Sequence, residues 1–142
     1  MIKNKTRFGY FEFKTPQGEA RKLSDYVGKS DYVIIDFWAS WCGPCIAEMP
    51  FLKKAYEKYK DKGLEIIGIS LDNSKPAWEK ALKKIDAPWI HLSDLQGSNP
   101  KLIEAYHFQS IPHTLILDKT GKIIAVNLRG KALDNWLKEK LD

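Results

Sequence analysis

A length of 142 residues, with 44% hydrophobic and 12% aromatic residues, predicts one folded domain with a substantial core and excludes a disordered chain. The net charge of +5 comes from lysines that are mixed with acidic residues, as in residues 53–62. This pattern favours a solvated helix face over a nucleic-acid site. No apolar run approaches the roughly 20 residues that a membrane-spanning helix needs.

The first elements along the chain are an edge strand and a central strand. Residues 8–13 alternate weakly and predict the edge strand, and residues 23–28 predict a short helical turn that ends at a glycine. Residues 32–37 form a β-branched apolar run, typical of a strand covered on both faces. Asp36 interrupts this run. It lies either at a solvated strand end or in the interior, where burial would raise its pKa.

A helix is expected to begin at Cys42. Pro44 suits its first turn, where a missing N–H costs nothing. Pro50 lies inside the helical pattern and predicts a kink, and Gly63 predicts the end of the segment. The apolar positions at helical spacing are Ile46, Met49, Leu52 and Tyr56.

The remaining elements alternate between strands and helices, and the last two strands form a hairpin. Alternation predicts parallel strands, whereas the hairpin adds antiparallel ones. The sequence therefore predicts an α/β fold with a mixed central sheet and helices on both faces. The expected segments are a strand at 64–71, a helix from 74, an extended piece at 89–92, a helix from 99, strands at 114–118 and 122–128, and a helix at 132–141.

The two cysteines of the chain form a C-x-x-C, which points to redox chemistry. A disulfide between Cys42 and Cys45 would enclose too little chain to act as a structural staple. At a helix N-terminus, the thiolate of Cys42 would be stabilised by unpaired N–H groups and the helix dipole. Cys45, one turn further and more buried, could then resolve a mixed disulfide formed at Cys42.

The W-C-G-P-C segment at 41–45 resembles the thioredoxin active-site motif. Asp36 matches that family's buried aspartate, and Pro50 matches the kinking proline of its active-site helix. Ile111–Pro112 matches the bond that is cis in thioredoxins and faces the disulfide. The resemblance implies a thioredoxin-like fold in which Cys42, Cys45, Asp36 and Pro112 serve catalysis.

A closer resemblance is to the TlpA/ResA-like branch of thiol–disulfide oxidoreductases. The lead-in at 23–29 is similar, Glu48 extends the motif to C-x-x-C-x-x-E, and residues 74–106 form an insertion before the cis-proline loop. The resemblance covers residues 8–142. It implies one thioredoxin-like domain over residues 1–142, either whole or as the C-terminal or mature part of a longer precursor.

This branch implies an enzyme that reduces protein disulfides. Cys42 would attack, Cys45 would resolve, and either Asp36 or Glu48 would accept the proton of Cys45. Glu48 could instead be an exposed helix residue. His113 departs from the family, in which a small residue or threonine is more usual. It would either tune the thiolate, contact the substrate or act as an ordinary strand residue.

The resemblance also implies the partners. These are disulfide-containing proteins, with apocytochrome thiols (cytochrome c maturation) and misoxidised envelope proteins as candidates, and an upstream electron-donor protein. It implies a monomer with no cofactor beyond the redox-active disulfide and no metal. The expected substrate groove consists of Trp41, Gly43, Pro44, Ile111, Pro112, His113 and the loop at 128–130.

Three other functions use the same cysteines. A disulfide oxidase or isomerase needs no different residues. A thiol peroxidase would need the pattern P-x-x-x-T/S-x-x-C, but Ile35 and Ala39 occupy the first two positions. A metal carrier would find only two thiolates in the single C-x-x-C, whereas structural zinc usually has four ligands. His91 and His107 are widely separated from the cysteines and are expected to be surface or capping residues.

The location of the protein depends on the resemblance. TlpA/ResA-like proteins usually work outside the cytoplasm, which implies an extracytoplasmic or periplasmic protein. Residues 1–5 contain no apolar segment of a signal peptide. If Met1 is the native start, a cytoplasmic location is expected instead.

Overall fold

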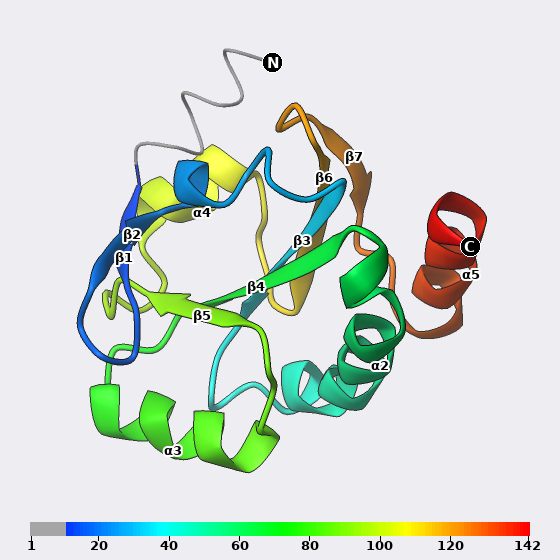
Figure 1. Ribbon diagram of the computed structural model, residues 1–142. Helices are drawn as coiled ribbons and strands as arrows, with labels where there is room; N and C mark the ends of the chain where they lie inside the picture. The colour runs from blue at the N-terminus through cyan, green and yellow to red at the C-terminus, as the bar shows by residue number, and fades with distance from the viewer. Residues whose placement is uncertain (1–10) are drawn as a thin grey trace.

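Seven strands form one mixed sheet in the computed structural model, which describes residues 11–142. Their order across the sheet is β2-β1-β5-β4-β3-β6-β7, and β3 and β4 lie in its interior (Figure 1). The pairs β3–β4 and β4–β5 are parallel, whereas β6 runs antiparallel to both β3 and β7. The strands are β1 (Glu12–Lys14), β2 (Ala20–Lys22), β3 (Tyr32–Trp38), β4 (Leu64–Ser70), β5 (Ile90–Ser93), β6 (His113–Asp118) and β7 (Ile123–Val126).

Helices cover both faces of the sheet, as predicted. The right-handed connections between successive parallel strands place α2 and α3 on one face, where α5 packs beside α2 (Figure 1). On the opposite face, Tyr106 of α4 packs on Phe37 of β3, with ring centroids 5.0 Å apart. The helical segments are η1 (Leu23–Asp25), α2 (Gly43–Tyr59), η2 (Lys60–Lys62), α3 (Lys75–Ile85), α4 (Pro100–Tyr106) and α5 (Gly130–Leu141).

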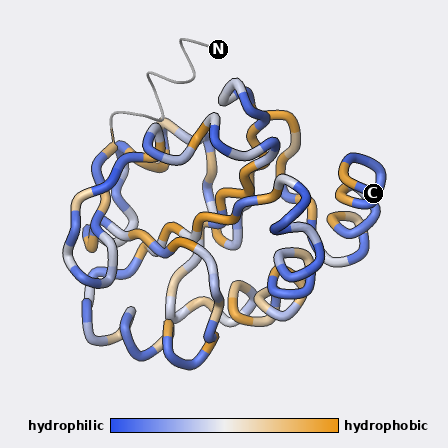
Figure 2. The backbone as a smooth tube through the Cα atoms, viewed as in Figure 1, coloured by the Kyte–Doolittle hydropathy of each residue, from blue (hydrophilic) through white to orange (hydrophobic). Residues whose placement is uncertain are grey.

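The buried central strand is confirmed. All of residues 33–38 are buried in β3, and Figure 2 shows apolar residues concentrated along the central strands. The side chains of Asp36 and Phe37 point to opposite faces because strand residues alternate. Asp36 therefore points towards the face covered by α2, and Phe37 towards the face covered by α4.

The N-terminal strands differ from the prediction. Residues 8–10 of the expected edge strand lie outside the described residues, and β1 is not an edge, because β2 and β5 flank it. The edge strand β2 is only three residues long and mostly polar, so it has no apolar alternation that could reveal it. The extended piece at 89–92 supplies β5, a strand of the main sheet.

The helix starts follow the predicted capping residues. Ser74 Oγ accepts from the N–H of Ala77, and Asn99 Oδ1 accepts from the N–H of Lys101. The helix α2 is continuous through Pro50, whose expected kink stays a prediction. After α2, the turn η2 leads to Gly63, which adopts the left-handed conformation expected of a terminating glycine.

Replacing Gly63 with alanine is expected to lower the free energy of unfolding by about 1–2 kcal/mol. Gly63 has φ +108°, and a Cβ there would lie 2.5 Å from Oδ2 of Asp31. Urea denaturation measures the loss. Gly18→Ala is the matched control, because Gly18 has φ +91° but open space around it. An equal loss in both variants would contradict the steric contribution at Gly63.

Residues 11–142 contain neither a candidate membrane-spanning helix nor a candidate cluster of metal ligands. No helix in this part of the chain is both long enough and apolar enough to cross a membrane. Nor do three or more His, Cys, Asp or Glu side chains come together there as a set of ligands for a metal ion.

Candidate active site

The two cysteines lie where β3 leads into α2. Cys42 is the N-cap of α2, with extended backbone, and Pro44 occupies the first turn. Cys42 and Cys45 form a disulfide, with their Cα atoms 5.3 Å apart. The backbone N–H of Cys45 donates to Sγ of Cys42 at 3.2 Å. After reduction, this N–H and the helix dipole would stabilise a thiolate at Cys42.

The surface over the disulfide favours access to Cys42. The exposed fraction is 5% for Cys42 and 1% for Cys45. Trp41 is 65% exposed beside them, and Gly43 and Pro44 are exposed as well. An incoming disulfide therefore meets Cys42 first, which supports the predicted order of attack.

The cis-proline loop lies at the same end of the sheet as the cysteines. The Ile111–Pro112 bond is cis, as the resemblance implied, and both residues are half-buried. The next residue, His113, pairs with Phe37 near the end of β3. Because β6 runs antiparallel to β3, the loop before β6 lies beside the segment that leads to Cys42.

His113 lies in an aromatic cluster on the α4 face of the sheet. Its ring stacks on Phe108, with centroids 5.2 Å apart, and it shares the face of Phe37. Burial, and secondarily the charge of Arg129, lower the pKa of His113, which favours the neutral imidazole. Of the roles considered for His113, this placement favours packing within the strand, because the side chain points away from the α2 face.

Asp36 is a buried carboxyl on the α2 face and is only 2% exposed. Of its two predicted placements, the interior is therefore correct and the solvated strand end is wrong. Its pKa is raised from 3.8 to about 7: burial is the largest cause and the charge of Glu48 the second, while the charge of Arg129 lowers the pKa. A carboxyl with this pKa can both accept and release a proton near neutral pH. Asp36 is thus suited to the proton transfers of a dithiol.

Glu48 lies one turn beyond the cysteines on α2 and is half-buried. Its Oε2 accepts a hydrogen bond from the backbone N–H of Gly130 at 3.0 Å. Glu48 is thus not a free, solvent-facing helix residue: it ties α2 to the start of α5. Its charge is the second cause of the raised pKa of Asp36.

Known proteins match this fold and site. The model of the AhpC/TSA family matches residues 5–126. The chain belongs to the AhpC/TSA family. The thiol–disulfide oxidoreductase ResA of Bacillus thuringiensis subsp. konkukian is 34% identical over 125 residues, which are 88% of this chain and 69% of the relative.

Solved structures agree with the sequence match. The thioredoxin domain of a thiol–disulfide oxidoreductase from Bacteroides vulgatus has a TM-score of 0.85 and 32% identity over 93% of each chain. A thiol–disulfide oxidoreductase from Bacteroides fragilis has a TM-score of 0.85 and 35% identity, covering 94% of this chain and 98% of that one. The predicted thioredoxin-like fold is confirmed, and this AhpC/TSA protein is a thiol–disulfide oxidoreductase.

The thiol peroxidase alternative is not favoured. At the two positions where the peroxidase pattern requires proline and a hydroxyl residue, this AhpC/TSA protein has Ile35 and Ala39. Both are fully buried apolar side chains that offer no hydroxyl. The C-x-x-C disulfide, by contrast, is the arrangement expected of an oxidoreductase.

Asp72 is a site residue that the sequence analysis missed. It is 1% exposed and follows the end of β4. Its Oδ1 accepts from Oγ of Ser40 at 2.5 Å, and its Oδ2 accepts from Oγ of Ser70 at 2.5 Å. The backbone N–H of Ser40 also donates to both carboxylate oxygens. Asp72 therefore fixes the turn that carries Cys42.

Arg129 is a second residue whose contacts the sequence analysis did not predict; it has an expected place only as part of the groove loop at 128–130. Its guanidinium donates to the carbonyl oxygen of Pro112 and to Oδ1 of Asn127. It thereby links the end of β7 to the cis-proline loop. The only sequence signal was its position just before the last helix.

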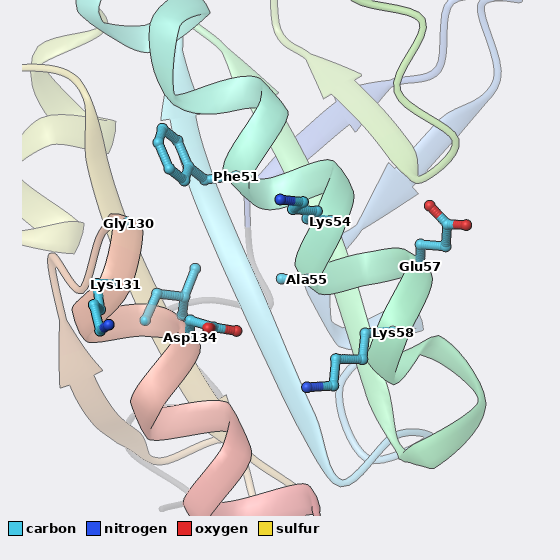
Figure 3. A pocket seen from close by; sticks show the side chains of 9 residues that line it. Phe51, Lys54, Ala55, Glu57, Lys58, Gly130, Lys131 and Asp134 are labelled. Atoms are coloured by element: carbon cyan, nitrogen blue, oxygen red, sulfur yellow. The ribbon is translucent and has the colours of Figure 1, made fainter.

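A large pocket lies away from the disulfide, between α2 and α5 (Figure 3). It has a volume of roughly 630 Å³, and its lining includes Phe51, Lys58 and Asp134 but neither cysteine. In Figure 3, Phe51 and Lys58 extend from α2 and Asp134 extends from α5. The cysteine chemistry therefore takes place outside this pocket, on a surface dominated by Trp41.

The remaining histidines lie outside the cysteine turn. His107 is exposed and occupies the C-cap of α4, as predicted. His91 is half-buried rather than exposed, and its Nε2 lies 2.8 Å from the carbonyl oxygen of Ala87, two residues after the end of α3. Burial lowers the pKa of His91, although this hydrogen bond opposes the effect.

Proposed function

We propose that this oxidoreductase reduces disulfides in protein substrates. The observation that carries the proposal is the geometry of the disulfide: Cys42 lies at the N-terminus of α2 and is the more exposed cysteine, and Cys45 is more deeply buried. The buried Asp36 and the cis Pro112 at the same end of the sheet support the assignment.

In the first step, the Cys42 thiolate attacks one sulfur of the substrate disulfide. A mixed disulfide forms between Cys42 and that sulfur, and the other substrate sulfur leaves as a thiolate. The helix N-terminus stabilises the attacking thiolate. The only proton taken up in this step is the one that protonates the leaving thiolate.

In the second step, Cys45 loses its proton and attacks the sulfur of Cys42. The proposed acceptor of the proton is Asp36, with Glu48 as its charged neighbour. The mixed disulfide breaks, the second substrate thiolate leaves, and the Cys42–Cys45 disulfide closes. The substrate has gained two electrons and the enzyme dithiol has lost two.

The proposed substrate is an extended segment of another protein. Trp41 is exposed, and Ile111 and Pro112, at the same end of the sheet, are partly accessible. This surface offers apolar contact and backbone groups, which suits transient binding of an extended chain. Oxidised apocytochrome cysteines and misoxidised envelope proteins are candidate substrates.

The proposed cycle needs an electron-donor protein and no further cofactor, because the cysteine pair itself carries both electrons. We place the protein, as a monomer, outside the cytoplasm, on the basis of its resemblance to the TlpA/ResA-like branch. In an oxidising compartment the pair would stay oxidised without a dedicated donor.

The reduction potential of the Cys42–Cys45 pair tests the direction of electron flow. Equilibration against defined thiol buffers is expected to give a value near about −270 mV, as for a reducing thioredoxin. A value between about −120 and −180 mV would instead indicate a disulfide oxidase or isomerase. The same two cysteines would then act with electrons flowing the other way.

A further inference from the structure

The loop at 127–130, between β7 and α5, contacts three parts of the site. Asn127 exchanges two hydrogen bonds with Thr114, the residue that pairs with Asp36 across the sheet. The N–H of Gly130 donates to Glu48 on α2. Between these two residues, Arg129 reaches the cis-proline loop. One short segment therefore contacts the strand beside Asp36, the active-site helix and the proline.

The guanidinium of Arg129 forms no ion pair with a carboxylate within residues 11–142. Its terminal nitrogen donates to the Pro112 carbonyl and to Oδ1 of Asn127, at 3.2 Å for the latter, and both acceptors are neutral. Its Nε is buried without a hydrogen-bond partner in that part of the chain. A half-buried guanidinium in such surroundings needs a nearby negative charge to offset its desolvation.

The carboxylates of the site supply that charge. Glu48 is hydrogen-bonded to Gly130, the residue next to Arg129. Asp36 is close enough for Arg129 to act on it electrostatically. The same side chain therefore holds the proline loop and acts electrostatically on Asp36.

We propose that Arg129 is a positioning residue for the dithiol reaction, which fixes the Pro112 carbonyl and supplies the positive charge that faces the carboxylates of Asp36 and Glu48. The inference rests on the proposed function, because it assigns Arg129 to the proton and substrate steps of that cycle. Arg129 itself touches neither sulfur in the described contacts.

The charged groups around Asp36 come from two elements. Glu48 on α2 raises the pKa of Asp36, and Arg129 on the loop lowers it, while burial is the largest influence. The cysteines precede Glu48 on α2. On the neighbouring strands, the residues paired with Asp36 are Gly68 and Thr114, which carry no charge. His113 points to the other face and tends to be neutral.

Two substitutions separate the charge from the hydrogen bond. Arg129→Gln keeps an N–H donor but loses the charge, whereas Arg129→Lys keeps the charge but loses the planar, multiple donor. Lys138→Gln, at an exposed position of α5, is the control for loss of one positive charge. The first readout is the titration of the Asp36 carboxyl by NMR in the oxidised protein, which requires no turnover.

The expected outcome is a split between the variants. In Arg129→Gln the titration midpoint of Asp36 rises by about one pH unit, so its ionised fraction at pH 7 falls from about one half to about one tenth. The rate of resolution at pH 7 then falls roughly fivefold. Arg129→Lys keeps the midpoint but raises the KM for a protein disulfide several-fold, because the Pro112 carbonyl loses its guanidinium partner.

An Asp36 midpoint in Arg129→Gln equal to that in Lys138→Gln would overturn the electrostatic role. An unchanged KM in Arg129→Lys would overturn the role at Pro112. If wild-type protein fails to reduce protein disulfides, the proposed function falls, but the NMR titration still decides the electrostatic role of Arg129. Thermal unfolding of each variant identifies any that is misfolded. If Arg129→Gln fails to fold, Arg129→Lys, which keeps the positive charge, still tests the role at Pro112.

Discussion

Cys42→Ser is expected to remove disulfide reduction, with a loss of turnover on the order of 10³-fold or more. Cys42 is the more exposed cysteine and lies at the helix N-terminus, and a serine hydroxyl cannot supply the thiolate nucleophile. Release of thiols from a disulfide-bonded protein substrate, with excess reductant to regenerate the enzyme, measures the effect. Cys45→Ser should also lose turnover but keep the first attack.

Trapping distinguishes the two cysteines. Cys45→Ser should accumulate mixed disulfides through Cys42, because the resolving thiol is missing. Cys42→Ser should trap few, since Cys45 is 1% exposed. Non-reducing electrophoresis of each variant after incubation with a disulfide substrate reads out the adducts, and the double variant is the background control. Equal trapping by both single variants would overturn the order of attack.

Asp36→Asn is expected to slow the reaction by about 10²-fold at pH 7, since general-base catalysis contributes roughly 10²–10⁴-fold. An asparagine keeps the shape of the side chain but cannot accept the proton of Cys45. The rate-limiting step should therefore become resolution of the mixed disulfide. Rapid quenching of single turnovers measures it. A variant that resolves at the wild-type rate would exclude Asp36 as the acceptor and direct attention to Glu48.

The same substitution should stabilise the oxidised protein at alkaline pH. The pKa of Asp36 is about 7 in the folded protein against 3.8 ordinarily, so between these values the folded state holds a proton that the unfolded state releases. The contribution of Asp36 to stability is therefore greatest at low pH and falls as pH rises towards about 7. At about 1.4 kcal/mol per pKa unit, ionised Asp36 costs on the order of 4 kcal/mol.

Urea unfolding of wild type and Asp36→Asn at pH 4 and pH 8 checks this linkage. The variant should gain stability relative to wild type between the two pH values, by up to about 4 kcal/mol. The comparison at pH 4 is the internal control, because wild-type Asp36 is then protonated in the folded state. A stability difference that does not change with pH would show that Asp36 titrates normally in the folded protein.

The sequence was sufficient to predict those parts of the site that depend only on residues close together in the chain. The buried strand and the helix start at Cys42 follow from neighbouring residues, because burial on both faces and helix capping are local patterns. For Asp36, the sequence left two placements open, the buried interior and a solvated strand end. Its neighbours are all apolar, but a strand end is solvated or covered according to what packs over it.

Contacts between distant segments could not be predicted. Asp72 bonds to Ser40 across 32 residues, and Glu48 bonds to Gly130 across 82. Such pairs depend on the order of strands in the sheet, which brings the ends of β3 and β4 together and places α5 beside α2. Nothing in the local pattern distinguishes Asp72 from an aspartate in any turn after a strand.

The pairing of Cys42 with Cys45 also has a consequence for oxidative damage. A sulfenic acid formed at Cys42 would have a thiol within bonding distance at Cys45, and the two would condense to the disulfide with loss of water. That product is the ordinary oxidised form, so the proposed electron donor would also repair the lesion. Irreversible sulfinic acid could form only if a second oxidant molecule arrived before the ring closed.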